Sequence, residues 1–396
     1  MSGVEERFGR DILISGWGHS RFGKLEDATL ESLVVGVGRD AIAAAGLEPR
    51  DIDEIVFGQY NAGMVAHAFP SSLALQISDE LHGVPASRVE NACASGSAAF
   101  QQGVKSLLAG TARNVLVIGA EKMTDAGADV VGSALLGADY DWAGRPSRTG
   151  FTGLFAEVAR AYEERHGPVG DVLGSIAAKN HRNGVDNPYA QLRKDLGVEF
   201  CRTVSERNPL IDAPLRRIDC SPVSDGAAAL VITTSPSSSA ATPPVRLAGF
   251  GAANDYAPAA RRDPLAFAGT RLAWRRATEM SGAGLDGLDF AEVHDCFTIA
   301  ELLVYEAIGL TADGDGTRAV EEGWVHREGR LPVNVSGGLK ATGHPVGATG
   351  VSQHVIAAMQ LTGTAGDLQL RGARRGAVHN MGGVAIANYV SVLEAV

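Results

Sequence analysis

Short apolar runs alternate with amphipathic stretches along most of this 396-residue chain. The runs "EIVFGQY", "NVLVIGAE" and "AAALVITT" have the length and the β-branched content of buried strands. A preceding stretch, "LESLVVGVGRDAIAAAG", repeats apolar residues at helical spacing and ends at Gly46, a residue type that favours helix C-termini. This alternation predicts an α/β fold with largely buried sheets.

The same pattern returns in the second part of the chain, with "FAEVHD" and a closing pair of strands around "GAVHNM" and "VAIANYVSVL". Between the two parts, the Ser- and Pro-rich segment 233–246 cannot build a packed element. We therefore place a boundary there and expect two halves, residues 1–245 and 246–396. Residues 124–220 are irregular between two good strands, so they predict an inserted loop domain of the kind that covers active sites.

Two glycines, Gly16 and Gly18, follow the strand-like "DILI". A dinucleotide-binding fingerprint would need a third glycine and an immediate helix, and both are missing. We interpret "SGWGHSRFG" as a turn between strands.

Composition and charge narrow the class of protein. The chain is 45% hydrophobic and 20% charged, as in ordinary globular proteins, and its net charge of −11 argues against a nucleic-acid partner. It shows no secretion leader and no apolar run of membrane-spanning length. We therefore expect no membrane association and take the cytoplasm as the default location.

The four cysteines, Cys93, Cys201, Cys220 and Cys296, form no CxxC pair, and no HExxH motif is present. In a long chain without a leader these residues are expected to be free thiols rather than disulfides. The ligand spacing of a zinc site is also missing, so we expect no metal.

Cys93 lies between a strand-like run and a helix that ends near Gly110, in "VENACASGSAAFQQGVKSLLAG". The residues after Cys93 are all small, which lets this helix lie close to another backbone. A thiol at a helix N-terminus is stabilised as a thiolate by the unpaired N–H groups, as a nucleophile requires. A small buried hydrophobe is an equally good interpretation of the local pattern.

The segment "EVHDCF" places His294, Asp295 and Cys296 on consecutive positions. In an extended chain His294 and Cys296 share one face and Asp295 points away. The following "TIAELLVYEAIGL" predicts a helix with Thr298 and Glu301 in capping-box register, so Cys296 precedes a helix start as Cys93 does. His294 is either a functional group at a strand end or a hydrogen-bonded core histidine.

His344 lies in the glycine-rich loop "GGLKATGHPVGATG", braced by Pro345, before a helix that should begin near Gly347 or Ala348. A base held on such a loop suits proton transfer, although an isolated loop histidine often has no role. In "HNMGGVA", Gly382 and Gly383 let backbone N–H groups approach an oxygen closely, which suits an oxyanion hole. A tight turn between strands explains these two glycines equally well.

Taken together and in this order, "NACASGSAAF", "EVHDCF", "GGLKATGHPVGATG" and "HNMGG" resemble the thiolase family. The similarity is greatest to its sterol-carrier-protein-type and archaeal-like branch and runs along essentially the whole chain. It implies a duplicated α/β fold in five αβαβα layers, with a loop domain inserted in the first half.

The resemblance also implies roles for individual residues. Cys93 corresponds to the acylated nucleophile and His344 to its activator. His294 would join His344 in a first oxyanion hole that stabilises an enolate. The backbone N–H groups of Cys93 and Gly382 would form a second hole around the acyl-thioester oxygen.

One position departs from the commonest thiolase pattern. Most thiolases have a cysteine where this chain has Asn380, and that cysteine exchanges the α-proton of the substrate. In the branch that carries "HDCF", the cysteine of that motif takes over, so the resemblance implies Cys296 as the acid and base.

The implied activity is reversible Claisen condensation and thiolytic cleavage of 3-ketoacyl-CoA, with acyl-CoA and coenzyme A as substrates and no bound cofactor. The implied assembly is a homodimer or tetramer. Two alternatives stay open. One is a thiolase-like acyltransferase or retro-aldolase that acts with a small zinc-ribbon/OB-fold partner, and the other is a non-catalytic acyl-CoA- or lipid-binding subunit.

Overall fold

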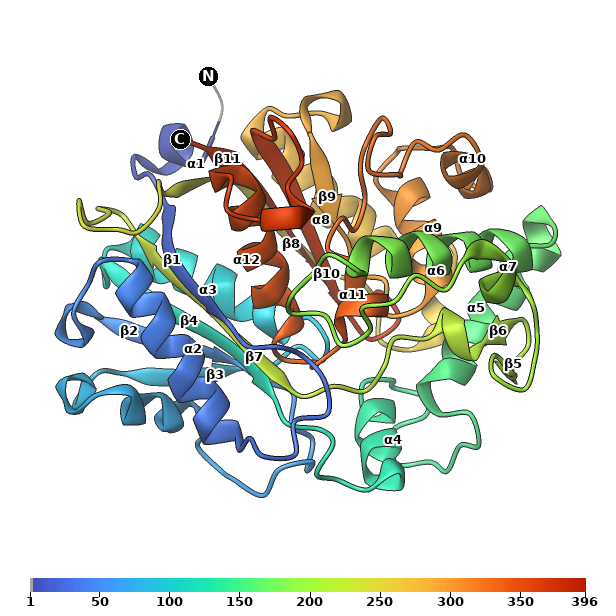
Figure 1. Cartoon of the computed structure of the whole chain (residues 1–396), viewed down its shortest axis with the longest axis horizontal. Helices are drawn as coiled ribbons and strands as arrows, with labels where there is room; N and C mark the ends of the chain where they lie inside the picture. Colours follow the sequence, from blue (N-terminus) through green and yellow to red (C-terminus); the bar gives the residue numbers. More distant parts are fainter. Residues whose placement is uncertain (1–2) are drawn as a thin grey trace.

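A nine-stranded mixed sheet forms the centre of the protein, whose computed structural model describes residues 3–396 (Figure 1). The strands are β1 Leu13–His19, β2 Glu54–Gly58, β3 Ala86–Val89, β4 Asn114–Glu121, β5 Leu210–Asp212, β6 Leu215–Arg216, β7 Gly226–Thr233, β8 Val245–Asn254, β9 Phe290–Glu292, β10 Arg375–Gly382 and β11 Ala387–Ala395. The α-helices are α1 Val4–Phe8, α2 Leu30–Ala44, α3 Ser95–Ala109, α4 Ala128–Leu136, α5 Gly150–His166, α6 Gly170–Gly184, α7 Val198–Arg202, α8 Ala268–Ser281, α9 Thr298–Ala307, α10 Gly316–Glu321, α11 Gly338–Thr342 and α12 Thr349–Thr362. The predicted strands and the helix that ends before Gly46 are present.

The strand order is β3-β2-β4-β7-β1-β8-β11-β10-β9, and β5 and β6 form a separate small sheet. The first five strands come from the first part of the chain and the last four from the second. The two parts join where β1 pairs with β8 over only two residue pairs, Leu13 with Arg246 and Ile14 with Val245. This narrow join lets the two parts of the sheet face each other.

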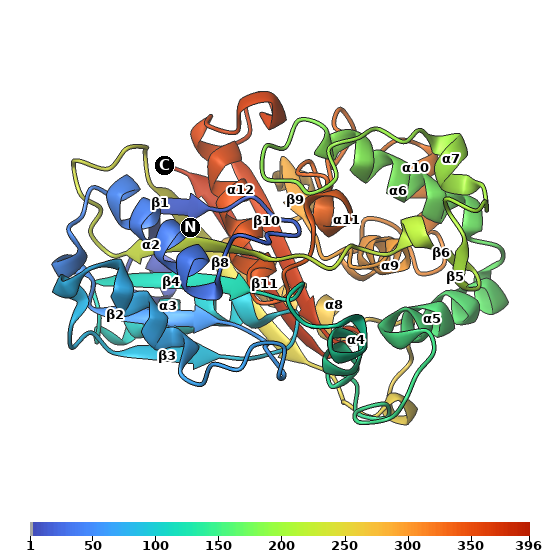
Figure 2. The same cartoon turned by 60° about the horizontal axis from the view of Figure 1, so that its bottom comes forward.

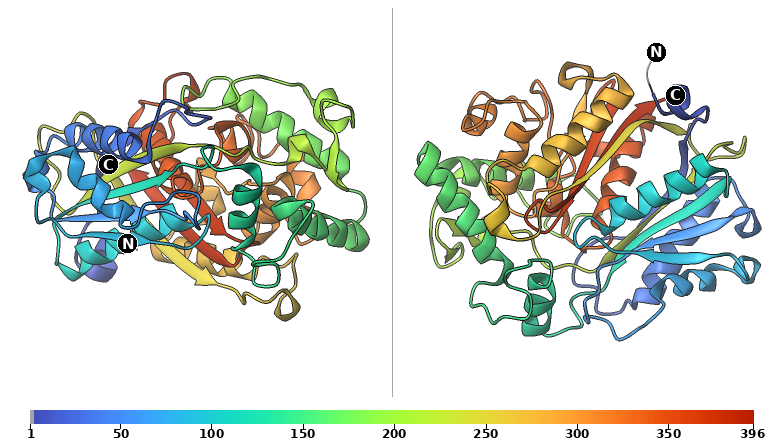
Figure 3. Two further views of the ribbon diagram at one scale, coloured as in Figure 1. Left: turned by 90° about the horizontal axis from the view of Figure 1, so that it is seen from below. Right: turned by 180° about the vertical axis from the view of Figure 1, so that it is seen from behind.

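Helices cover both faces of each part of the sheet. α3 and α12 pack together in the middle, α3 against β2 and β4, and α12 against strands of both parts. α2 packs on the outer face of the first part and α8 on the outer face of the second (Figures 1 and 3). The layers are therefore αβαβα, which confirms the fold class predicted from the sequence.

The segment between β4 and β7 leaves the sheet and carries α4 to α7 and the β5–β6 pair. Figures 1 and 2 show it in green beside α9 to α11 at one end of the molecule. Its apolar residues, among them Phe155, Tyr162 and Leu173, share a core cluster with α8 and α9. The division into halves at residue 245 and the loop domain at 124–220 stay predictions.

Within residues 3–396, no helix combines the length and the apolar character that a bilayer span requires. The four cysteines are unpaired, as expected.

The turn predicted around Gly16 and Gly18 is wrong, because both residues lie inside β1. Helix α2 packs directly on this strand. A Cβ at Gly16 would lie 2.3 Å from the backbone nitrogen of Ala45, and a Cβ at Gly18 would lie 2.2 Å from the carbonyl oxygen of Val37. The glycines therefore serve the contact between helix and strand, which local pattern does not disclose.

Gly18→Ala should lower the free energy of unfolding by about 1–3 kcal/mol, because the added methyl group collides with α2 backbone. Gly36→Ala is the matched control. Gly36 lies on α2 itself, and a Cβ at this position would have nothing within 4 Å. That change should stabilise the protein by about 0.5–1 kcal/mol through helix propensity. Chemical denaturation measures both, and equal effects of the two variants would contradict the packing argument.

Candidate active site

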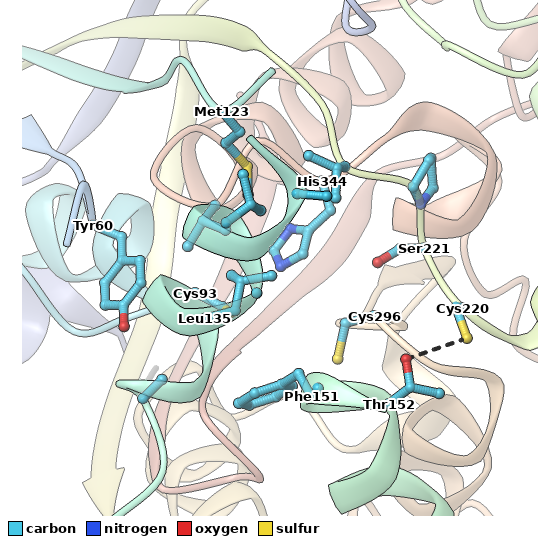
Figure 4. A pocket seen from close by; sticks show the side chains of 18 of the residues that line it. Tyr60, Cys93, Met123, Leu135, Phe151, Thr152, Cys220, Ser221, Cys296 and His344 are labelled. Atoms are coloured by element: carbon cyan, nitrogen blue, oxygen red, sulfur yellow. Dashed lines mark hydrogen bonds between the residues drawn. The ribbon is translucent and has the colours of Figure 1, made fainter. Parts of the chain in front are cut away.

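A cavity of about 440 Å³ lies between the segment that follows β4 and the loops that precede α3 and α12 (Figure 4). Its wall is mostly apolar and includes Met123, Val131 and Leu135 from the region of α4 and Phe151 from α5. Three residues singled out in the sequence also line it: Cys93, Cys296 and His344. Segments that are more than 200 residues apart in the chain therefore contribute to one cavity.

Cys93 is held in a tight turn just before α3. Its neighbour Ala92 has a φ of 49°, a conformation that residues other than glycine rarely adopt. The Ser95 hydroxyl accepts a hydrogen bond from the N–H of Asn91 and donates one to the carbonyl of Ala92. The turn is thus stabilised by its own sequence, and it presents Cys93 to the cavity from a rigid base.

The two histidines lie beside this thiol. Cys93 Sγ and one ring nitrogen each of His294 and His344 all lie within 4.8 Å of one another. The two imidazole rings meet edge to face, with centroids 5.1 Å apart and an interplanar angle of 82°. All three side chains are buried. Burial makes the placement of each proton decisive, because few water molecules can compensate an unmatched group.

Thr349 determines the protonation pattern of His344. The Thr349 hydroxyl donates to the carbonyl of Pro345 at 3.0 Å, so its oxygen accepts from Nδ1 of His344, which lies 2.7 Å away. The proton of the neutral ring is therefore on Nδ1. Nε2 has no protein partner among residues 3–396 and carries a free lone pair. The loop is also anchored by the Ser224 hydroxyl, which accepts from the His344 N–H at 3.0 Å.

His294 has the opposite pattern. The amide NH₂ of Asn380 lies 2.9 Å from Nδ1 of His294 and 3.1 Å from the carbonyl oxygen of Cys93. Because the amide donates to Nδ1, the proton of the neutral ring is on Nε2. This nitrogen likewise lacks a partner within the described chain. One histidine thus offers a lone pair and the other an N–H near the same thiol.

A cysteine and two histidines at these distances are also ligand types that zinc prefers. A metal at Nε2 of His294 would need a lone pair there and hence a proton on Nδ1. That proton would point at the Asn380 amide, which is itself a donor. Metal-bound histidines normally have an acceptor at the second nitrogen, so the arrangement fits proton chemistry better than metal binding.

The pKa of Cys93 corrects one argument made from the sequence. Burial raises the pKa of the thiol to about 12, although N–H groups of Gly383 and of Cys93 itself act in the opposite direction. The helix N-terminus therefore does not make a resting thiolate. Burial also lowers the pKa of His344 to about 3, so thiol and imidazole are both neutral and the thiol needs a base at the moment it reacts.

Cys296 faces the same cavity from the segment before α9 and is 4% exposed (Figure 4). Burial raises its pKa well above the ordinary value, and the nearby Cys93 adds to the shift. Cys296 is therefore a neutral thiol, able to give a proton but not to take one in this state.

Asp295 points away from the cavity. Its carboxylate accepts from the backbone N–H of Leu339 and from the amide of Asn180. It thereby joins the HDCF segment to α11 and α6. Burial and the nearby Glu301 raise the pKa of Asp295 above its ordinary value.

The capping box predicted for Thr298 and Glu301 is wrong. Phe297 is the N-cap residue, and the Thr298 hydroxyl donates to Asp219 instead. Glu301 is fully buried and forms an ion pair with Lys179 at 2.7 Å. Both residues meet partners that are distant in the sequence, and these partners outcompete the local cap.

The two glycines of "HNMGG" lie next to the Cys93 turn. A Cβ at Gly382 would lie 2.2 Å from the carbonyl oxygen of Asn91, so only glycine fits there. The N–H of the next residue, Gly383, donates toward Cys93 Sγ. The end of β10 therefore brings a backbone donor, the N–H of Gly383, to the thiol. The role of Gly382 in an oxyanion hole stays a prediction.

Residues that support the site escaped the sequence analysis. Glu121 at the end of β4 accepts N–H groups from Tyr60, Asn61 and Gly347, which ties the His344 loop to the first part of the sheet. Thr349 follows His344 by five residues in an ordinary helix start. Neither position carries a local signal. Asn380 did carry one, as a departure from the commonest thiolase pattern.

A second cavity of about 660 Å³ adjoins the first and shares Thr152, Cys220, Ser221 and Pro222 with it. Four cationic side chains line this chamber, and none of the carboxylates in the described chain does. They are Arg193, Lys194, Arg217 and Lys340. Lys340 is 2% exposed, and burial lowers its pKa. Its ammonium group is poorly hydrated, and a bound anion would compensate for the missing water.

Sequence models of known families cover both parts of the chain. The model of the thiolase N-terminal domain matches residues 16–236, more than half of the protein, and the thiolase C-terminal domain-like model matches residues 251–395. This chain belongs to the thiolase family. The resemblance inferred from the four motifs is confirmed.

Relatives of this thiolase include an acetyl-CoA acetyltransferase of Methanothermobacter thermautotrophicus, 36% identical over 94% of this chain and 97% of the relative. Sterol carrier protein 2 of Oryctolagus cuniculus is 29% identical over 94% of this chain and 70% of that protein. Among solved structures, an Ltp2-ChsH2(DUF35) aldolase covers 97% of this chain and 98% of its own, with a TM-score of 0.80 and 22% identity. Human mitochondrial 3-ketoacyl-CoA thiolase in complex with CoA covers 98% of both chains with a TM-score of 0.72 and 16% identity. The two structures show the shared fold.

Acylation of Cys93 in this thiolase should be nearly independent of pH between about pH 5 and pH 9. An ordinary histidine base loses its lone pair as pH falls through about 6.5. Burial moves the pKa of His344 to about 3 and that of Cys93 to about 12, so neither group titrates in this range. The rate of acyl-enzyme formation, followed by rapid quenching and intact-protein mass spectrometry, tests this. A fall of the rate below a midpoint near pH 6.5 would show that His344 titrates normally.

Proposed function

We propose that this protein is an acyl-CoA C-acyltransferase of the thiolase type, which cleaves or forms 3-ketoacyl-CoA through an acyl group on Cys93. The observation that carries the proposal is the trio of Cys93, His344 and His294. The buried thiol of Cys93 and one ring nitrogen each of His344 and His294 lie within 4.8 Å of one another. Cys93 and His344 also line the apolar cavity.

In the first half-reaction of thiolysis, Cys93 Sγ attacks the 3-keto carbon while its proton moves to Nε2 of His344. The bond between C2 and C3 then breaks, and its electron pair forms an enolate of the departing acyl-CoA. The protonated His344 and Nε2–H of His294 both donate to the enolate oxygen, where two fixed donors lower the barrier. The same histidine thus acts first as base and then as donor.

Cys296 completes this half-reaction as an acid. Its raised pKa keeps it protonated before the substrate arrives, and it gives its proton to C2 of the enolate. The first product leaves as a saturated acyl-CoA. At this stage Cys93 is acylated, His344 is protonated and Cys296 is a thiolate.

In the second half-reaction the thiol of coenzyme A passes its proton to the Cys296 thiolate and attacks the acyl group on Cys93. Cys93 leaves as a thiolate and recovers its proton from His344. All three groups return to their starting states, so the cycle balances. Backbone N–H groups of Cys93 and Gly382 are proposed to bind the acyl oxygen. The synthetic direction follows the same steps in reverse.

The basic chamber next to the catalytic cavity supports coenzyme A as the carrier. A thioester at Cys93 would extend past Ser221 and Pro222, which border both cavities. Its phosphate groups would then lie near Arg193, Lys194, Arg217 and Lys340. Cationic side chains without competing carboxylates suit a polyanionic ligand.

Three further expectations rest on the resemblance. The protein should assemble as a homodimer or tetramer, and we place it in the cytoplasm. A small zinc-ribbon/OB-fold partner also stays open, and the likeness in fold to the Ltp2-ChsH2(DUF35) aldolase supports testing for one. With such a partner the alternative activity would be cleavage of a hydroxyacyl-CoA. Thiolysis by the purified chain alone would favour the thiolase reaction.

Cys296→Ala should still form acyl-Cys93 from acetyl-CoA, although more slowly than the parent, because Sγ of Cys93 and His344 are untouched and the thiolate of coenzyme A can leave without the proton of Cys296. Exchange of the α-protons of acetyl-CoA with deuterated water should fall by about 10²–10⁴, the usual contribution of a general acid or base. Mass spectrometry of the protein and of the thioester measures the two steps separately.

Cys93→Ser is the complementary variant, and it should abolish the acyl-enzyme. Cys201→Ser is the matched control, since Cys201 is buried in a different apolar cluster. An acyl group found on Cys296 alone would overturn the assignment of the nucleophile. Absence of any acyl-enzyme in the parent would favour a binding subunit.

The double variant Arg193→Ala/Lys194→Ala should raise KM for acetyl-CoA by roughly tenfold, as expected for the loss of charge-assisted contacts with phosphate. Turnover of acetyl-pantetheine, which lacks the nucleotide, should not change. Lys105→Ala on the exposed face of α3 is the control for general charge effects. Equal effects on both thioesters would show that the chamber does not bind the phosphates.

A further inference from the structure

Asn380 lies on β10 at the point where the turn that holds Cys93, the HDCF segment and α12 meet. Its side chain is fully buried. Two hydrogen bonds leave its NH₂ group, to the carbonyl oxygen of Cys93 at 3.1 Å and to Nδ1 of His294 at 2.9 Å. Within the described chain, Asn380 is therefore the single side chain that contacts both the nucleophile backbone and a histidine of the trio by hydrogen bonds.

The orientation of the amide follows from these partners. The carbonyl of Cys93 accepts hydrogen bonds and donates none, so the group that faces it at 3.1 Å must be the NH₂ group. With the amide reversed, two oxygens would face each other in a buried site, and that contact is repulsive. The second hydrogen of the same NH₂ group then points at His294.

Packing prevents the amide from turning away. A Cβ at Gly350, in the first turn of α12, would lie 2.4 Å from Oδ1 of Asn380 and 2.3 Å from the backbone nitrogen of Ser97 on α3. The oxygen side of the amide is thus enclosed between the two central helices. Since β10 is paired with β11 at this residue, the backbone is fixed as well.

A donor at Nδ1 leaves only one neutral form of His294, with the proton on Nε2. Because Asn380 occupies Nδ1, Nε2 is the ring nitrogen left to donate a hydrogen bond, and it has no protein partner in the described chain. An acceptor in place of Asn380 would reverse the pattern and turn Nε2 into a lone pair. Both histidines would then face the thiol as acceptors, and the donor for the enolate oxygen would be lost.

We propose that Asn380 is a positioning residue that sets His294 as a hydrogen-bond donor and, through the same NH₂ group, holds the carbonyl of Cys93. The inference rests on the proposed function, because Nε2–H of His294 is needed as a donor only if an enolate oxygen forms beside it. It assigns a role to the position at which most thiolases have a proton-transferring cysteine. Here the position orients a donor, and Cys296 transfers the proton.

The direct test is the protonation state of His294, read by ¹⁵N NMR of protein labelled at its ten histidines. The His294→Gln variant identifies the signals by their loss. In the parent protein Nε2 should carry the proton and Nδ1 should not. In Asn380→Asp the carboxylate accepts from the ring, so the proton should move to Nδ1. A proton on Nδ1 of the parent would overturn the proposal, whatever the protein catalyses.

The kinetic test compares Asn380→Asp with Asn380→Ala. Both variants remove the NH₂ donor, but Ala also removes the packing of the side chain, whereas Asp keeps its shape and adds an acceptor. Exchange of α-protons in acetyl-CoA should fall by about 10²–10³ in Asn380→Asp, the loss expected for one oxyanion donor. Asn380→Ala should lose less, because the His294 ring keeps a share of the Nε2–H form. KM should change little in either variant.

The pH dependence of α-proton exchange separates an effect on the His294 proton from a loss of packing around Asn380. In Asn380→Asp the protonated acid can still donate to Nδ1, so exchange should recover as pH falls and decline as pH rises, whereas the parent stays flat. Cys93 acylation should be alike in the two variants. Equal exchange rates at every pH would reduce Asn380 to a packing role. If the parent itself forms no acyl-enzyme and exchanges no protons, the proposed function fails, while the NMR result still decides the role of Asn380.

Discussion

The close approach of backbones around Cys93 is the constraint on which the rest of the site depends. The first turn of α3 contacts the His344 loop with almost no side-chain bulk between them, and a Cβ at Gly96 would lie 2.8 Å from the carbonyl oxygen of Gly347. Gly350 meets Ser97 and Asn380 in the same way, and Gly382 meets Asn91. These contacts bring the ends of two sheet strands and the starts of two helices to one thiol.

Burial follows from that approach, and burial decides the electrostatics. The thiols of Cys93 and Cys296 have raised pKa values and the rings of His294 and His344 have lowered ones, so the resting site carries no charge on these groups. Reactivity then depends on where each neutral group keeps its proton. Hydrogen bonds decide this: a hydroxyl that accepts leaves His344 a base, and an amide that donates leaves His294 a donor.

Several features were predictable because they depend on short stretches of sequence. Strands such as β4 and β7 are apolar runs of the expected length, and α2 ends before a glycine in the left-handed conformation. The αβαβα layers followed from the family motifs. Local rules failed where distant partners act: Gly16 and Gly18 lie within a strand because α2 packs on them, and Thr298 donates to Asp219 rather than capping its helix.

The sequence by itself determined which chemical groups are available: Cys93, His294, Cys296 and His344, each next to small residues or a helix start. It could not determine their protonation, because that depends on partners from other segments. Tertiary structure placed Thr349 beside one imidazole and Asn380 beside the other, and it buried both thiols. The physical reason is that a pKa and a tautomer are properties of the surrounding dielectric and hydrogen bonds, which arise only when distant segments pack together.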